Sequence, residues 1–184
     1  MKWFGTKAAT GDARPVLARA WGSGAVALGE WPASYEAQVR SGVMSNAVAQ
    51  RALRLVSEGA GATVLKAYGV DAAAQVLALV QRTSAGQGLV ETLASHLLLH
   101  GNAYVQVMAG ADGMPAELFA LRPERVSVEA DARGWPMAYL YRVGDSVTRL
   151  SPEDGAGRIS VLHLKSLHPL DDHYGLGCLD AAAG

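Results

Sequence analysis

Residues 95–108 read SHLLLHGNAYVQVM, and this stretch decides how the chain is interpreted. Apolar residues and two histidines, His96 and His100, precede a Gly101–Asn102 pair, after which the apolar residues follow a different spacing. Two hypotheses compete. The histidines could form a metal or catalytic site, or a helix could end at the pair and continue as a strand.

The helix-to-strand hypothesis explains the stretch better. Two histidines four residues apart share a helix face and can bind a metal, but the zinc protease motif needs Glu immediately after the first His, where this chain has Leu97. Gly101 supplies the left-handed residue that commonly ends a helix. We therefore predict a helix over residues 89–100, with both histidines toward the edge of its apolar stripe, and a strand from Ala103.

The same reasoning predicts the other elements. A helix follows the capping residues Ser45 and Asn46 and stops at Gly59 and Gly61, a short strand spans residues 63–68, and a further helix begins at Asp71. After Ala103 come strands separated by turns, including a hairpin around residues 144–145, and then a helix that opens at Cys178. The fold class is α+β, with N-terminal helices packed on a mainly antiparallel sheet.

Residues 1–33 differ from the rest because they are rich in Gly, Pro and small residues and show no sustained period. We interpret them as a flexible or subunit-docking arm, and residues 34–184 as one α+β domain. A solvated linker rarely carries several large aromatic residues. Trp3, Trp21 and Trp31 are therefore candidates for contact with a neighbouring subunit or with the chain's own domain.

Composition excludes several classes of protein. The formal net charge of −1 gives no global attraction to nucleic acid or to an anionic membrane. The single cysteine, Cys178, rules out an intramolecular disulfide, and we interpret it as a small buried apolar residue. The N-terminus lacks the apolar segment of a secretory signal, and no stretch approaches the roughly 18–20 apolar residues of a membrane span.

A second cluster of ligand-type side chains lies near the C-terminal end. Two adjacent carboxylates and nearby imidazoles could bind zinc or manganese, which gives the alternative of a metal-dependent hydrolase. The competing interpretation is a positioned loop that needs Gly175 and Gly177 for its backbone geometry. The cluster comprises His163, His168, Asp171, Asp172 and His173.

Four segments in order carry a resemblance: SNAVAQRALRLVSEGAGATVLKAY, LVETLASHLLLHGNAYVQVM, GMPAELFALRPERVSVEAD and ISVLHLKSLHPLDDHYGLGCLDAA. Over residues 44–183 the chain resembles the N-terminal half of portal proteins from tailed phages and gene transfer agents. The family commonly has a Ser-Pro pair where this chain has Gly177 and Cys178. Because the resemblance covers half of such a protein, we expect more chain beyond Gly184.

The resemblance implies a wing-type domain in a ring, usually of twelve subunits, at a capsid vertex of a virion or gene transfer agent particle assembled in the bacterial cytoplasm. Its partners would be further copies, the major capsid protein, the terminase large subunit, the head–tail adaptor and double-stranded DNA. It implies no cofactor, metal or catalytic residue. Near-neutral charge suits DNA that slides without being gripped. A small adaptor that forms no ring remains an alternative.

Arginines in the strand-rich part are candidates for charged contacts with DNA or with a neighbouring subunit. The three that we single out are Arg122, Arg125 and Arg142.

Overall fold

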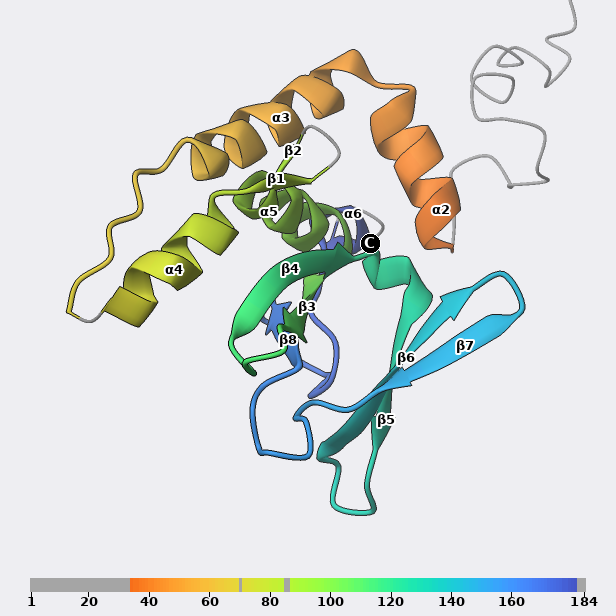
Figure 1. The fold of residues 1–184 in the computed structure, drawn as a ribbon. Helices are drawn as coiled ribbons and strands as arrows, with labels where there is room; N and C mark the ends of the chain where they lie inside the picture. Colours follow the sequence, from red (N-terminus) through yellow and green to blue (C-terminus); the bar gives the residue numbers. More distant parts are fainter. Residues whose placement is uncertain (1–33, 70, 85–86, 182–184) are drawn as a thin grey trace, which may run out of the picture.

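The computed structural model describes residues 34–69, 71–84 and 87–181 (Figure 1). The helices are α2 (Tyr35–Gln38), the π-helix η1 (Val39–Met44), α3 (Ala47–Gly61), α4 (Asp71–Val80), α5 (Leu89–His100), the 3₁₀ turn η2 (Pro123–Arg125) and α6 (Cys178–Ala181). The strands are β1 (Thr83–Ser84), β2 (Gln87–Gly88), β3 (Asn102–Ala109), β4 (Pro115–Leu121), β5 (Val126–Ala130), β6 (Pro136–Val143), β7 (Ser146–Leu150) and β8 (Val161–Lys165).

Two three-stranded antiparallel sheets form the centre of the fold. The first has the order β4–β3–β8, and the second has the order β5–β6–β7. Tyr104 on β3 lies opposite Leu121 on β4 and His163 on β8, so these three side chains point to the same face. In the second sheet Val126 lies opposite Tyr141.

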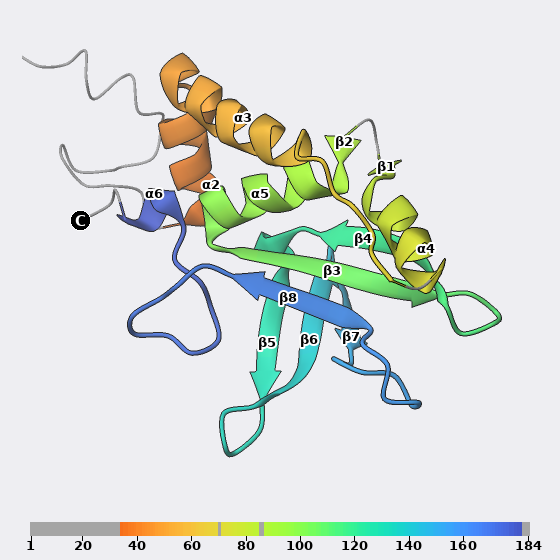
Figure 2. The same cartoon turned by 90° about the vertical axis from the view of Figure 1, so that its left-hand side faces the viewer.

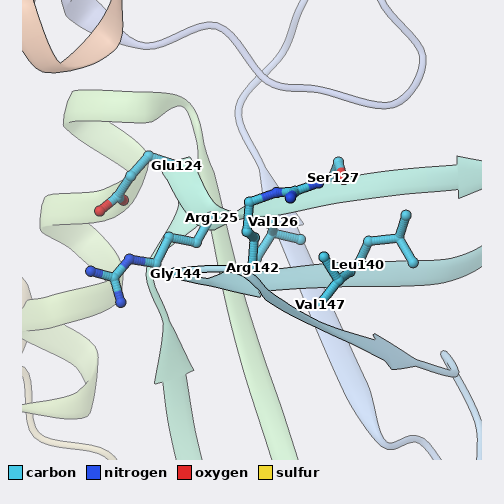
Figure 3. Close-up of a pocket in the computed structure, with 8 residues that line it drawn as sticks. All are labelled: Glu124, Arg125, Val126, Ser127, Leu140, Arg142, Gly144 and Val147. Carbon is cyan, nitrogen blue, oxygen red and sulfur yellow. The ribbon is translucent and has the colours of Figure 1, made fainter.

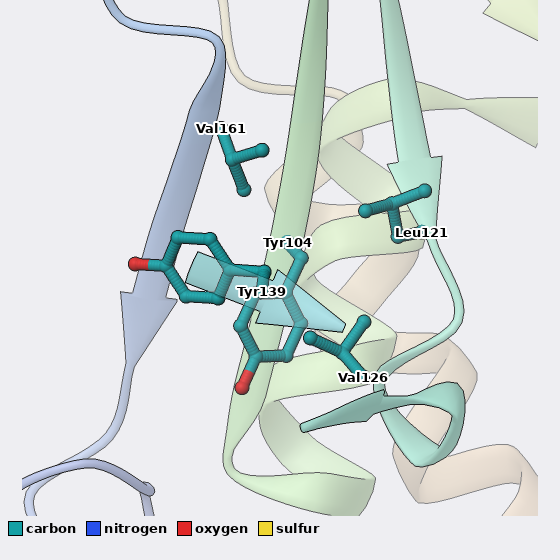
Figure 4. Close-up of a cluster of buried hydrophobic side chains, with 5 residues drawn as sticks. All are labelled: Tyr104, Leu121, Val126, Tyr139 and Val161. Carbon is teal, nitrogen blue, oxygen red and sulfur yellow. The ribbon is translucent and has the colours of Figure 1, made fainter. Parts of the chain in front are cut away.

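The core lies between the two sheets (Figure 4). It consists of Tyr104, Leu121, Val126, Tyr139 and Val161, all of them buried. The rings of Tyr104 and Tyr139 meet edge to face, with their centroids 5.6 Å apart. This arrangement is favoured for aromatic pairs, so the two tyrosines join the sheets.

The helices cover the opposite face of the first sheet, so the molecule has three layers (Figure 2). Helix α5 packs on β3 and β4, and α3 packs on α5. Asn46 caps α3, because its Oδ1 accepts hydrogen bonds from the N–H groups of Val48 and Ala49 at 3.0 and 3.2 Å. None of the helices in the described residues combines the length and apolar content needed to cross a bilayer.

Most sequence predictions are confirmed, including the α+β class, the bounds of α5 and the β6–β7 hairpin. Two details were wrong. Residues 63–68 form no strand, because they pair with none of the described strands. His96 and His100 do not lie at an exposed edge but are half-buried like Leu97 and Leu98 beside them, because α3 and the sheet cover this helix on two sides. Helix α3 ends at Gly61 as predicted, with Gly59 inside its last turn.

Candidate functional site: a locked junction and an arginine-lined groove

The stretch from Ser95 to Met108 is a helix–glycine–strand junction. Helix α5 ends at Gly101, which has a φ of 76°, and the Gly101 N–H donates to the carbonyl of Leu97 at 3.0 Å. Strand β3 starts at the next residue, Asn102. The left-handed conformation turns the chain sharply at low cost only for glycine. Residues 95–108 therefore form a structural junction between a helix and a strand, as the helix-to-strand hypothesis predicted.

Asn102 holds this junction to the C-terminal YGLG segment. Its side chain is 1% exposed, and its Oδ1 accepts hydrogen bonds from the Gly175 N–H at 2.8 Å and from His163 Nε2 at 3.0 Å. Its Nδ2 lies 3.3 Å from the carbonyl of Gly175 and 3.1 Å from that of His100. One buried amide therefore satisfies polar groups from three segments of the chain.

Glycine is required where these segments touch. A Cβ atom added to Gly175 would overlap the carbonyl oxygen of Gly101, and one added to Gly177 would overlap the carbonyl oxygen of Leu99. The two glycines of the YGLG segment therefore allow its backbone to lie directly against the end of α5. This explains their spacing by packing, without a nucleotide or phosphate.

Tyr174 connects the same segment to the second sheet. Its hydroxyl oxygen accepts a hydrogen bond from the Val128 N–H on β5 at 2.9 Å. The HGN, RPERVSV and YGLG segments, which are far apart in the sequence, therefore meet at one place. Sequence reasoning identified the three motifs but missed the roles of Asn102 and Tyr174, because neither residue type signals its partner.

His163 is neutral in this environment. Its ring stacks on Tyr104 with centroids 4.2 Å apart and meets the edge of Tyr139 at 5.8 Å. Burial, and secondarily the Lys165 charge, lowers the pKa of His163 to about 4. Because Asn102 Oδ1 can only accept, Nε2 of His163 carries the proton that is donated.

The two histidines of α5 are also packed residues. Burial lowers the pKa of both His96 and His100. The His100 ring meets Tyr35 edge to face at 4.7 Å, and its Nδ1 lies 3.2 Å from Asn102 Nδ2. His100 therefore packs against α2 and β3, and its position on the helix needs no metal to explain it.

The proposed metal cluster does not form in the described residues, where no three or more His, Cys, Asp or Glu side chains are placed to hold a metal ion. His163 faces the core. Asp171 Oδ1 instead accepts from the N–H groups of His173 and Tyr174 at 2.7 and 2.9 Å, and those bonds lower the pKa of Asp171. His168 Nδ1 accepts from the Leu170 N–H at 3.1 Å. The competing prediction of a positioned loop explains this segment, and the metal site required by the hydrolase hypothesis is not formed by these described residues.

One further prediction fails at the start of α6. Cys178 is exposed, and the neighbouring Leu179 is the buried residue. The helix begins at Cys178, and adjacent residues of a helix point in different directions, so Cys178 faces solvent while Leu179 faces the interior.

The three tryptophans proposed as subunit contacts, Trp3, Trp21 and Trp31, lie outside the described residues.

The three candidate arginines are not equivalent. Arg125 and Arg142 line a shallow groove of about 310 Å³ on the outer face of the second sheet, and Leu140 and Val147 line it on the side of Arg142 away from Arg125 (Figure 3). Arg122 is not part of this lining, and its Nη1 lies 3.5 Å from the carboxylate of Glu124. Within the described ranges, neither Arg125 nor Arg142 has an ion-pair partner. These two charges are therefore available to a ligand or partner.

Other arginines of the strand region are already paired within the subunit. Arg149 Nε lies 2.9 Å from Glu129, and Arg158 Nη2 lies 2.8 Å from Asp154. The first pair connects β5 to β7 across β6, above Ala138, which is fully buried. Each pair therefore joins residues within one sheet or one loop of the same subunit.

Comparison with known proteins identifies the class to which this fold belongs. The family model described as phage portal protein matches residues 47–184, and the chain belongs to this family. Relatives from Rickettsia bellii and Rickettsia felis, both described as uncharacterized proteins, are 31% and 34% identical over 148 and 152 residues. These matches cover 75% of this chain but only 37% of each relative.

Solved structures agree with the family. A chain from the neck of an empty GTA particle has a TM-score of 0.71 and 35% identity, covering 83% of this chain and 43% of that one. A chain from the virion of a native gene transfer agent particle has a TM-score of 0.70 and 36% identity, covering 91% and 44%. An HK97 family phage portal protein from Corynebacterium diphtheriae shares the fold, with a TM-score of 0.52. Its identity is 16%, and the match covers 84% of this chain and 45% of that one.

Proposed function

We propose that the protein is a structural subunit of a portal ring at the neck of a gene transfer agent or phage particle, and that DNA passes through this ring during packaging and ejection. The observation that carries the proposal is 36% identity over 91% of this chain to a chain of a native gene transfer agent virion. The locked junction supports a wall-forming role, because its polar residues are used in holding segments together.

The partners follow from the same similarity. Neck structures of such particles are described with C6 and with C12 symmetry, and a ring of twelve subunits is compatible with both. The major capsid protein would surround the ring. The terminase large subunit would dock on it during packaging, and the head–tail adaptor would replace the terminase afterwards. The ring itself carries out no reaction.

The full-length gene product tests this proposal. Purified protein should form closed rings in electron micrographs, with a mass close to that of twelve subunits by light scattering. Deletion of the gene should give particles without DNA, and the intact gene should restore packaging. A product that stays monomeric at high concentration would contradict the proposal, and a defined complex with a capsid protein but no ring would favour the small adaptor.

We further propose that Arg125 and Arg142 make charged contacts in the assembled ring. The lining of their groove also includes the apolar side chains of Leu140 and Val147 and the carboxylate of Glu124, which favour a protein partner over a DNA backbone. Arg122, already beside Glu124, should contribute less.

Charge reversal separates the two partners. The double substitution Arg125→Glu and Arg142→Glu should prevent ring formation if a neighbouring subunit is the partner, whereas intact rings with less packaged DNA would indicate DNA. Arg133→Glu is the matched control, because Arg133 is exposed in another turn of the same sheet.

The N-terminal arm is the other proposed subunit contact. Removal of residues 1–31, which include Trp3, Trp21 and Trp31, should prevent assembly of the full-length protein while leaving the monomer folded. Rings of normal yield after this deletion would show that the arm is not needed.

A further inference from the structure

The connection between α3 and α4 has the composition of a strand but no strand partner. Residues 63–68 read TVLKAY, in which Thr, Val and Tyr favour strands. The segment runs as an elongated connection at one end of the molecule (Figure 1). In the described part of the chain, the backbone groups of residues 64–68 have no hydrogen-bond partner.

The side chains of this connection are exposed as well. Val64 and Tyr68 are 78% and 83% exposed. Leu65 and Tyr68 join Val76 and Leu77 of α4 in lining an apolar groove of about 570 Å³. An apolar surface that borders an unpaired backbone segment is the arrangement expected where another strand is received.

The second sheet has a free edge at the other end of the molecule. Strand β7 pairs only with β6 among the described strands, and four of its five residues are exposed. The end of the β6–β7 hairpin extends past β5, because Arg142 and Val143 have partners on β7 but none on β5. Val143 and Val147 are 50% and 46% exposed there.

These two surfaces are placed as a head-to-tail contact requires. In Figure 1 the α3–α4 connection and the β6–β7 hairpin lie at opposite sides of the molecule, and in Figure 2 α4 faces the viewer while the hairpin lies behind the first sheet. A ring is closed by contacts between two different surfaces of identical subunits. The charges also match, since Lys66 lies in the connection and Asp145 at the hairpin turn, both exposed.

We propose that residues 63–68 of one subunit add to the free edge of β7 in the neighbouring subunit, so that the β5–β6–β7 sheet continues across the subunit boundary. This inference rests on the proposed ring and specifies one of its contacts. Backbone hydrogen bonds would supply the affinity, and the valines of the hairpin would cover Tyr68 and Leu65.

Proline at position 66 tests the strand addition in the full-length protein. Lys66→Pro removes an N–H that has no partner among the described residues, and it favours an extended Leu65. The melting temperature of the monomer should therefore stay unchanged, while the yield of rings should fall by about tenfold or more. Ala132→Pro is the control, since Ala132 occupies the second position of the turn closed by the Gly134 N–H and the Asp131 carbonyl.

Charge reversal gives an independent test that does not depend on proline being tolerated. Lys66→Asp and Asp145→Lys should each lower the yield of rings, and the two together should restore it. If wild-type protein forms rings and both Lys66→Pro and Lys66→Asp form them equally well, the strand addition is wrong while the ring remains. If wild-type protein forms no rings, the proposed function itself fails.

Discussion

Strand β3 and strand β7 belong to neighbouring sheets but differ sharply in their surroundings. Ala103, Tyr104 and Val105 of β3 are at most 3% exposed, with the second sheet on one side and α5 on the other. Strand β7 is exposed over all but its last residue. The comparison shows that burial is concentrated beside β3, whereas the second sheet leaves the edge at β7 and the groove beside Arg142 exposed.

The largest expected effect is that of Asn102→Ala. The substitution leaves the N–H and carbonyl of Gly175 and the His163 ring without a buried partner, so the free energy of unfolding should fall by about 4 kcal/mol. Urea denaturation measures the change. Gln106→Ala, at a half-buried position of the same strand, should cost clearly less; equal costs would contradict the role of Asn102.

Two glycines with similar backbone angles separate crowding from conformational strain. Gly101 and Gly134 have φ values of 76° and 85°, but an added Cβ would lie 2.5 Å from backbone atoms of Gly175 at the first and meet nothing within 4 Å at the second. Gly101→Ala should therefore cost about 3 kcal/mol and Gly134→Ala about 1 kcal/mol. Similar losses in thermal unfolding would show that contact with the YGLG segment adds nothing.

Acid should destabilise the fold through the protonation of His163. The pKa of His163 is about 4 in the folded protein and 6.5 ordinarily, so the unfolded chain takes up a proton first as the pH falls. The stabilising contribution of neutral His163 is fully present above about pH 6.5 and is lost as the pH falls toward 4. After allowance for partial exposure, His163 contributes about 1–2 kcal/mol of this decrease.

His163→Gln should make the pH dependence of unfolding shallower without abolishing it. His96 and His100 also have lowered pKa values and act in the same direction. Unfolding measured between pH 4 and pH 7 gives the comparison. A curve that is unchanged by the substitution would exclude His163 as a contributor.

Tyr174→Phe tests the bond between the junction and the second sheet. Loss of the hydroxyl leaves the Val128 N–H without its acceptor, and the expected cost is about 1 kcal/mol. Hydrogen exchange should show faster exchange of the Val128 amide in particular. Unchanged exchange at this amide would show that the hydroxyl does not protect it.

The smallest effect on folding is expected in the groove. Arg125→Ala and Arg142→Ala remove exposed charges that have no ion-pair partner in the described residues, so each should change the free energy of unfolding by less than about 0.5 kcal/mol. A larger decrease in the free energy of unfolding would show that these arginines stabilise the fold, as the residues of the junction do.

Local patterns were sufficient to predict many of the elements. The alternation after Gly101, the cap at Asn46 and the turn at Gly144 each depend on residues close in sequence, and each prediction was correct. Residues 63–68 show the limit of this reasoning. Their composition favours a strand, but a strand exists only with a partner, and the described residues offer none.

The sequence by itself determined the α+β class, the helix that ends at Gly101 and the motifs that resemble the portal family, because these follow from periodicity and backbone preference within short segments. Only the tertiary structure decided that Asn102 bonds to Gly175, 73 positions away, and that His163 belongs to the core. It also decided that Arg125 and Arg142 share a groove. Such contacts depend on how two sheets pack against each other, and that packing depends on residues far apart in the chain.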